Sequence, residues 1–165
     1  MRGKYGWELW AKVYRRELFD EPMYIPCHLR IGEDATVYMQ LVARSCKVKI
    51  INEALYNYIQ YPSSASHQRS VTLAEETLQA AFYIDHLLKK ESFYQEIRDE
   101  IDAMYLLFYS NSTRKAFLRL NHPLIYQVYQ EHYSLRALKI LPLFKSIYIS
   151  LSLLFKKTYH NLNSN

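Results

Sequence analysis

Apolar side chains in one stretch of the first half of the chain recur at the spacing of an α-helix. The pattern begins at Glu33 and places four apolar residues on one face: Ala35, Met39, Val42 and Cys46. Glu33 and Asp34 open this helix, where negative charge stabilises the helix dipole. The sequence therefore predicts a helix over residues 33–46 with an apolar face and an acidic first turn.

Patterns on both sides of this helix predict β-strands. Residues 47–51 alternate lysines with Val48 and Ile50, as a half-buried strand does. Residues 8–14 and 54–61 are rich in aromatic and branched side chains, which favour strands. Together these elements predict a small α/β unit over residues 1–67. Because so small a sheet cannot bury both of its faces alone, we expect another element to cover it.

The remainder, residues 68–165, has helical periodicity and forms a second predicted region. Thr72 and Glu75 have the spacing of a capping box, so a helix is expected from there to about Lys89–Lys90. A second helix is expected over residues 97–108, with a break at residues 111–113. Shorter helices are predicted at residues 114–120, 123–132 and 135–141.

The last apolar stretch, residues 142–155, leaves two interpretations open. It carries Lys145 in its middle, precedes Lys156 and Lys157, and is too short and interrupted for a membrane span. One interpretation is a helix packed on its neighbours. The other is an amphipathic helix on a membrane surface, with its lysines at anionic headgroups.

Composition narrows the function classes. The chain has 16 tyrosines, only 3 glycines and a formal net charge of +5, and it lacks both the dinucleotide fingerprint and the Walker pattern. A basic, aromatic-rich chain fits nucleic acid, an anionic membrane or phosphorylated small molecules, and it also fits a plain solvated surface. Because no nucleic-acid-binding motif is present, no nucleic-acid partner is expected. Cys27 and Cys46 are too few for a zinc site and are expected as free or buried thiols in a reducing cytoplasm.

The candidate chemistry rests on a few residue types. A carboxylate on a rigid helix start can act as a general base, although helix capping alone also explains Glu33 and Asp34. The aromatic rings of Tyr56 and Tyr58 face one side of a predicted strand, where they could pack together or stack on a sugar. The six histidines show no metal-ligand spacing. His67, which follows a serine-rich turn, is the one candidate metal ligand.

Four blocks together resemble a known family. They are Trp10–Phe19 (WAKVYRRELF), Ile31–Asp34 (IGED), Ile50–Tyr58 (IINEALYNY) and the serines at positions 64 and 66. Their order and spacing resemble the second half of the family 2 glycosyltransferases, which have a GT-A fold. The resemblance implies a partial GT-A-like α/β unit, followed by a mostly helical C-terminal region.

The resemblance also implies an activity, which is inverting sugar transfer from a nucleotide-sugar donor to a hydroxyl of a glycan acceptor in bacterial surface polysaccharide synthesis. Asp34 would be the base that deprotonates the acceptor hydroxyl, and Glu33 would orient the acceptor or the base. The expected substrate contacts come from the matching blocks: Trp10, Lys12, Arg15, Tyr56, Tyr58 and Ser64. A divalent metal, Mg or Mn, is expected for the complete family enzyme.

The sequence departs from this family in one large respect. No nucleotide-binding half and no Asp-x-Asp motif are present, so we expect little or no transferase activity from this chain alone. A separate N-terminal half or a homo-oligomer would then complete the enzyme, in the cytoplasm or at the inner face of the membrane. The alternative is a non-catalytic remnant or a binding module for a membrane surface or a partner protein.

Overall fold

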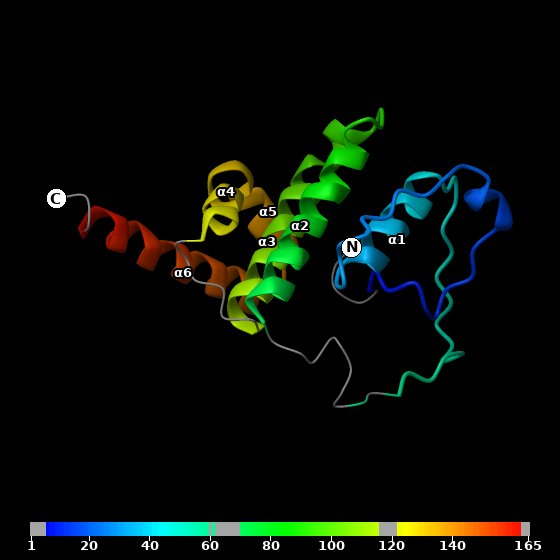
Figure 1. The fold of residues 1–165 in the computed structure, drawn as a ribbon, viewed down its shortest axis with the longest axis horizontal. Helices are drawn as coiled ribbons and strands as arrows, with labels where there is room; N and C mark the ends of the chain where they lie inside the picture. The colour runs from blue at the N-terminus through cyan, green and yellow to red at the C-terminus, as the bar shows by residue number, and fades with distance from the viewer. Residues whose placement is uncertain (1–5, 60, 62–69, 116–121, 163–165) are drawn as a thin grey trace.

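The computed structural model describes residues 6–59, 61, 70–115 and 122–162 (Figure 1). Within these ranges the chain forms six α-helices and two short 3-10 helices, η1 (Arg16–Phe19) and η3 (Tyr94–Ile97), and no strand. The expected α/β unit of GT-A type is therefore wrong, and the described protein is a small helical domain.

The first expected strand, residues 8–14, is interrupted by its own backbone. Ala11 has a φ of 56°, in the left-handed region, which an L-residue enters at a cost of about 1 kcal/mol and which breaks the extended path. The side chains on either side of Ala11 are turned to separate contacts rather than to the alternating faces of a strand. Trp10 stacks on tyrosine rings, and Lys12 lies over Tyr38.

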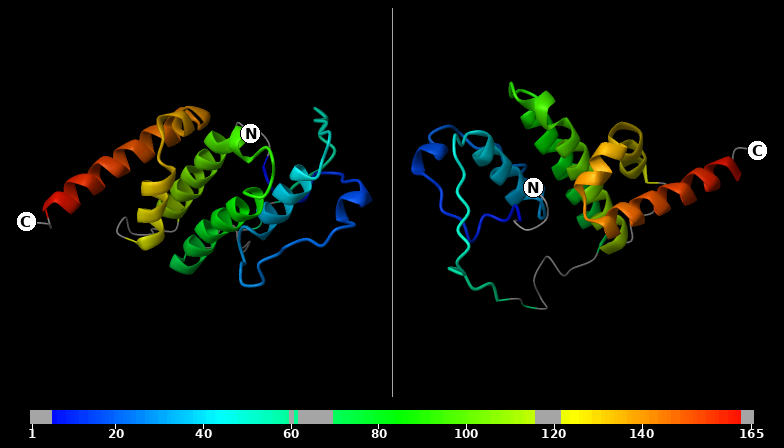
Figure 2. Two further views of the ribbon diagram at one scale, coloured as in Figure 1. Left: turned by 90° about the horizontal axis from the view of Figure 1, so that it is seen from above. Right: turned by 180° about the vertical axis from the view of Figure 1, so that it is seen from behind.

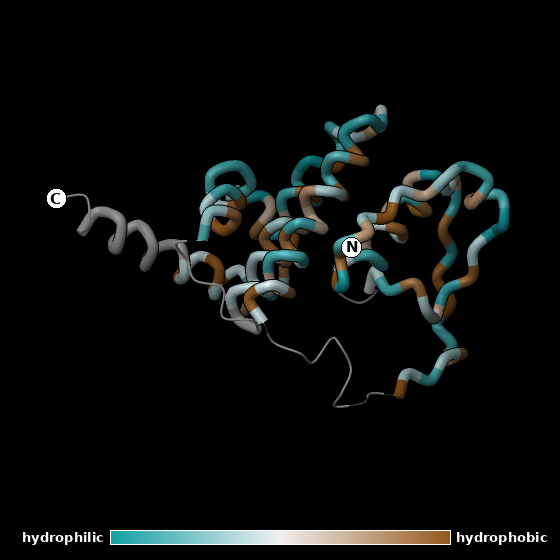
Figure 3. Tube along the Cα trace, in the orientation of Figure 1, coloured by the Kyte–Doolittle hydropathy of each residue, from teal (hydrophilic) through white to brown (hydrophobic). Residues whose placement is uncertain are grey.

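The other two expected strands, residues 47–51 and 54–61, pair with no other strand in the described part of the chain, which leaves out residue 60. Their apolar side chains are exposed, with Val48 at 63%, Leu55 at 74% and Ile59 at 67%. Figure 3 colours the chain by hydropathy and marks hydrophobic positions along these segments. Alternating apolar and polar residues indicate that a segment is compatible with a sheet. A strand also requires a neighbouring strand that pairs with its backbone N–H and C=O groups. That neighbour is absent among the described residues.

Helix α1 (Glu33–Ala43) confirms the predicted helix, although it ends three residues before Cys46, which is exposed. Of the predicted apolar face only Ala35 is fully buried, and the other buried side chains of α1 are not on it: Thr36, Val37, Tyr38, Gln40 and Leu41. The reason is a loop that covers a second side of α1. The side-chain amide of Gln40 on α1 binds the backbone of Tyr24 in this loop. It accepts a hydrogen bond from the Tyr24 N–H at 2.9 Å and donates one to the Tyr24 carbonyl at 2.8 Å.

Helix α2 (Val71–Leu88) begins one residue before Thr72, because Ser70 is the residue that caps it. The Ser70 hydroxyl accepts from the Leu73 N–H at 3.1 Å. Helix α3 (Arg98–Lys115) continues through the break expected at residues 111–113. The hydroxyls of Ser112 and Thr113 donate to the carbonyls of Ala74 and Tyr109, so these buried polar residues are satisfied inside a helix.

Helices α4 (Pro123–His132), α5 (Leu135–Ile140) and α6 (Leu143–Leu162) complete the domain, and the predicted helices at 123–132 and 135–141 are confirmed. Helix α2 packs between α1 and α3, and α3 packs on its other side against α4, α5 and α6 (Figures 1 and 2). The core is centred on α3, where Tyr105, Leu106 and Tyr109 are almost completely buried.

Candidate functional site

The acidic start of α1 is fixed by a glycine that no other residue can replace without strain. Gly32 caps the helix with a φ of 98°, and the Thr36 N–H and hydroxyl both donate to its carbonyl at 3.0 Å. Its Cα also lies against buried Ala80 of α2, where a β-carbon would collide with that of Ala80. The backbone that presents Glu33 and Asp34 is thus anchored to the helical core.

The residue that precedes this turn ties it to α2 as well. The Arg30 backbone N–H donates to Glu76 Oε2 at 2.9 Å, and its guanidinium contacts Oε1 at 2.9 and 3.1 Å. Burial disfavours charge on Glu76, but the hydrogen bonds and charge of Arg30 outweigh it and lower the pKa of Glu76. The pair therefore stays ionised and holds residues 30–32 on α2.

Asp34 and Tyr38 are four residues apart and so lie on one face of α1. The Lys12 ammonium lies 5.0 Å from the centre of the Tyr38 ring, and it also donates to the Glu8 carbonyl. Tyr14 reaches the same face. Burial, followed by the neighbouring Tyr38 and the charge of Asp34, raises the pKa of the Tyr14 phenol. Among the described residues, no hydrogen bond or ion pair engages the Asp34 carboxylate.

An aromatic stack lies next to Lys12 in the sequence. The Trp10 ring is stacked on Tyr58 at 4.5 Å with 4° between the planes, and on Tyr56 at 5.2 Å with 18°. All three rings stay partly open, with exposed fractions of 37% for Trp10, 49% for Tyr56 and 45% for Tyr58. The structure thus brings together three predicted site residues from segments more than 40 residues apart.

Glu33 differs from its neighbour Asp34 in its surroundings. Its Oε2 is buried and has no hydrogen-bond partner within the described residues. Burial raises the pKa of Glu33. A hydrogen bond from its own backbone N–H opposes this shift, and the charges of Asp34 and Glu76 add to it. Glu33 is therefore the inner carboxylate, while Asp34 is the one whose charge acts on Tyr14.

Other predicted site residues are not gathered here. Arg15 is exposed where it precedes η1, and Ser64 and His67 lie outside the described residues. No group of three His, Cys, Asp or Glu side chains that could hold a metal comes together in the described ranges. The Mg or Mn that the resemblance implies for a complete family enzyme stays a prediction. Sequence reasoning also missed Tyr14 and Tyr38 as members of this cluster.

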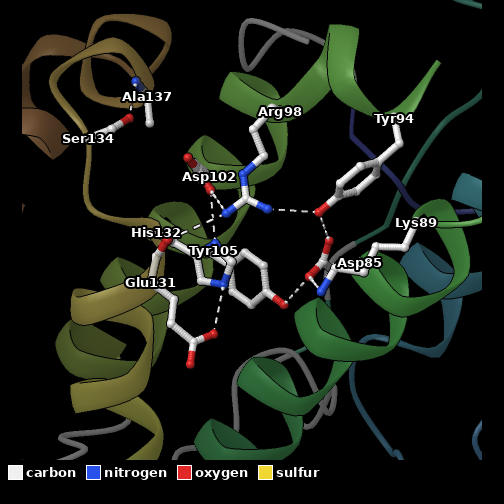
Figure 4. A network of polar contacts seen from close by, with 10 residues as sticks. All are labelled: Asp85, Lys89, Tyr94, Arg98, Asp102, Tyr105, Glu131, His132, Ser134 and Ala137. Carbon is white, nitrogen blue, oxygen red and sulfur yellow. Dashed lines mark hydrogen bonds and ion pairs between the residues drawn. The ribbon is translucent and has the colours of Figure 1, made fainter.

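A second polar cluster lies inside the helical core (Figure 4). Asp85 accepts from the hydroxyls of Tyr94 at 2.6 Å and Tyr105 at 3.1 Å, and it pairs with Lys89 at 3.0 Å. Burial opposes the charge on Asp85, yet the hydrogen bonds from Tyr94 and Lys89 lower its pKa. Burial, followed by the charge and hydrogen bond of the same carboxylate, raises the pKa of the Tyr105 phenol far above its usual range.

Arg98 links this group to an Asp–His pair. Arg98 donates to the Tyr94 hydroxyl at 2.9 Å and pairs with Asp102 at 3.2 Å, and Asp102 accepts from His132 Nδ1 at 2.9 Å (Figure 4). The centre of the His132 ring lies 3.5 Å from that of the Tyr105 ring, and the two rings are nearly parallel. The buried His132 Nε2 has no hydrogen-bond partner within the described residues and lies 3.8 Å from Glu131 Oε2 (Figure 4).

An oriented Asp–His pair is also the geometry of a general base, but this one has no access to a substrate. His132 is 3% exposed and Asp102 is 7% exposed. Two surface hollows lie elsewhere, at residues 139–142 and between the end of α1 and residues 87–91. A base requires hydrogen-bond reach to its substrate, so this cluster is structural.

Comparison with known proteins gives no relative: no protein-family model, no curated protein and no solved structure matches this chain. Among the described residues, no helix has the length and apolar character needed to cross a bilayer. The case for function therefore depends on the geometry at α1.

Proposed function

We propose that the face of α1 around Asp34 binds a glycan acceptor, and that the protein acts on the acceptor side of sugar transfer. The observation that carries this proposal is the convergence of Trp10, Tyr56 and Tyr58 into one half-exposed aromatic stack, two residues from the Lys12 that lies on the Asp34–Tyr38 face. Aromatic faces bind the apolar C–H face of a pyranose, and nearby polar groups set its orientation.

Asp34 is the residue best placed to act on a bound hydroxyl. It sits on the first turn of α1, on a backbone that Gly32 and the Arg30–Glu76 pair hold in place, and its carboxylate is free of protein partners among the described residues. In the proposed step the acceptor O–H proton moves to Asp34, and the oxygen bonds to the anomeric carbon of a nucleotide-sugar. The bond from that carbon to the phosphate oxygen breaks, and a nucleoside diphosphate leaves.

This proposal covers the acceptor only. The described residues offer no acidic metal cluster, so no step is assigned to a metal. The fold does not support a GT-A sheet, and the proposal depends on the α1 face rather than on that architecture.

The test is acceptor binding, measured by saturation-transfer NMR against a panel of oligosaccharides. We expect Trp10→Ala to weaken the affinity for the best ligand by about tenfold or more, as loss of a stacking ring does. Tyr61→Ala removes an exposed ring that has no part in the stack and should leave the affinity unchanged. Asp34→Asn should change the affinity for the oligosaccharide by no more than about threefold, because a general base stabilises the transition state more than the bound acceptor.

Two results contradict the proposal. One is the absence of binding to every oligosaccharide in the panel by folded wild-type protein. The other is binding that Trp10→Ala and Tyr61→Ala reduce equally, since this would place the glycan away from the stack.

A further inference from the structure

The C-terminal end of the chain carries positive charge that no acidic residue of the same segment offsets. Residues 135–165 contain no Asp or Glu and five basic residues: Arg136, Lys139, Lys145, Lys156 and Lys157. These five account for the whole formal net charge of +5, because the other 16 basic residues are balanced by the 16 acidic ones. Residues 1–134 are therefore neutral in sum, whereas the last two helices, α5 and α6, contain basic residues and no acidic ones.

The same segment exposes apolar side chains along one face of α6. Leu143, Ile147 and Leu151 follow one another at intervals of four residues and are 77%, 50% and 51% exposed. With Phe144, which is 59% exposed, they lie within an arc of roughly 100° around the helix, given about 100° per residue. These four residues make up the exposed face of α6.

The opposite side of α6 attaches it to the core. Ile149 is fully buried, and its position on the helix is diametrically opposite the centre of the exposed face. The Ser152 hydroxyl contacts the Tyr109 hydroxyl at 2.8 Å, and the Tyr148 hydroxyl donates to Thr113 at 2.9 Å. The orientation of α6 is thus fixed by packing on α3, and the exposed face is directed away from α3.

The exposed face is also accessible. Each of its four side chains is at least half exposed, and in Figures 1 and 2 α6 leads away from the other helices towards the C-terminus. Leu135 on α5 is 71% exposed, and the exposed side chain of Lys139 lines the hollow at the turn between α5 and α6. An exposed apolar residue and an exposed cation thus lie on α5, which precedes the exposed face in the sequence.

We propose that the exposed face of α6 docks onto an anionic lipid surface, lying in the plane of the interface. An interfacial helix buries an apolar face at the headgroup–acyl boundary, while basic residues attract anionic lipids, and this segment supplies both. A second copy of the chain is a poorer occupant, because pairing two α6 helices would bring together segments that carry only positive charge. Nucleic acid offers no apolar surface to this face. The proposal does not depend on the proposed acceptor site.

The test is partition of the whole protein into vesicles, measured by flotation. Binding to phosphatidylcholine vesicles that contain phosphatidylglycerol should exceed binding to phosphatidylcholine alone by at least about tenfold, and added salt should reduce it. The double substitution Ile147→Glu/Leu151→Glu should lower binding to the mixed vesicles by about tenfold or more.

Val48→Glu/Ile50→Glu is the matched control. Both of its sites are exposed, at 63% and 54%, and it changes the net charge by the same amount far from α6 in the sequence. It should lower binding by no more than about threefold, because salt screens distant charges. Circular dichroism should show that both variants stay folded, since all four positions face solvent.

Three outcomes overturn the proposal. They are equal binding to both kinds of vesicle, an equal loss of binding in the two double variants, and the absence of vesicle binding. Absence accompanied by a concentration-dependent dimer that Ile147→Glu/Leu151→Glu dissociates would assign the exposed face to a second copy instead.

Discussion

Gly32 and Ala80 are in such close contact that a β-carbon on Gly32 would overlap the β-carbon of Ala80. Ala80 is fully buried in α2 and cannot move aside. This contact attaches the backbone next to Asp34 to the helical core. A substitution that adds one methyl group at Gly32 therefore tests where the candidate site lies.

Gly32→Ala should lower the free energy of unfolding by about 2–4 kcal/mol, from a left-handed φ and a steric clash together. Urea denaturation measures the change. Gly6→Ala provides the control, because the atoms nearest its added β-carbon belong to the flexible end of the Glu8 side chain, and its effect should stay within about 0.5 kcal/mol. Equal stabilities for the two variants would mean that α1 is not seated on α2 as described.

Arg44 should control the loop that covers α1. Its guanidinium donates to the carbonyls of Leu18 at 3.0 Å, Glu21 at 2.9 Å and Pro22 at 2.9 Å. Arg44→Ala should accelerate amide exchange over residues 16–24 and lower the unfolding free energy by about 1–2 kcal/mol, since two of the bonds are exposed. Arg44→Lys should give most of this effect, because one ammonium cannot reproduce the fork. Unchanged exchange in Arg44→Ala would show that the loop is held by other contacts.

The Asp85 cluster should behave as one unit. Tyr105→Phe removes a hydrogen bond to a carboxylate and should cost about 1.5–3 kcal/mol of unfolding free energy, while keeping the ring contact with His132. Asp85→Asn should cost about 2–4 kcal/mol, because Lys89 loses its ionic partner and two buried hydroxyls share a weaker acceptor. In a double-mutant cycle the combined loss should be smaller than the two single losses added together. If the two losses of unfolding free energy simply add, Tyr105 and Asp85 do not act as one unit.

His132 should give the protein a pH dependence below neutrality. Burial lowers the pKa of His132, and Arg98 assists, while Asp102 and Asp85 oppose the shift. The unfolded chain then binds more protons than the folded one as pH falls below the unfolded value of about 6.5. Stability is therefore fully present above that value and decreases as pH falls towards the folded pKa, by at most about 1.4 kcal/mol per pH unit.

His132→Gln should remove this slope between roughly pH 5 and 6.5, as measured by urea denaturation at a series of pH values. The difference between wild type and variant isolates His132, because contributions from Glu33 and the other histidines are common to both. Asp85, whose pKa is lowered, contributes its own loss only below about pH 4. An identical slope in wild type and variant would contradict the burial of a neutral His132.

Most helices could be predicted from the sequence because their apolar residues recur at the helical period along the face that packs on the core. The helix predicted at residues 123–132 appears as α4 with the same bounds, helped by Pro123 in its first turn. The prediction of a break at Ser112 and Thr113 was wrong because their hydroxyls donate to backbone carbonyls, one on α2 and one within α3. Composition alone does not reveal these hydrogen bonds.

Strands were not readable in the same way. Residues 47–51 and 54–59 have patterns compatible with a sheet, yet a pattern specifies side-chain direction and not the partner that pairs with the backbone. At the candidate site the sequence indicated Trp10, Tyr56 and Tyr58, which do stack together. Tyr14 and Tyr38 gave no signal, because their importance arises only where one segment folds across another. Whether the stack binds a sugar stays a prediction.

The exposed stretch at residues 47–59 also bears on how the protein behaves at high concentration. Its branched side chains have the composition of an aggregation-prone segment, and Lys47, Lys49 and Glu53 are interspersed among them as gatekeepers. Their repulsion between molecules weakens as ionic strength rises. We therefore expect added salt to promote association of the protein through this stretch while the helical core stays folded.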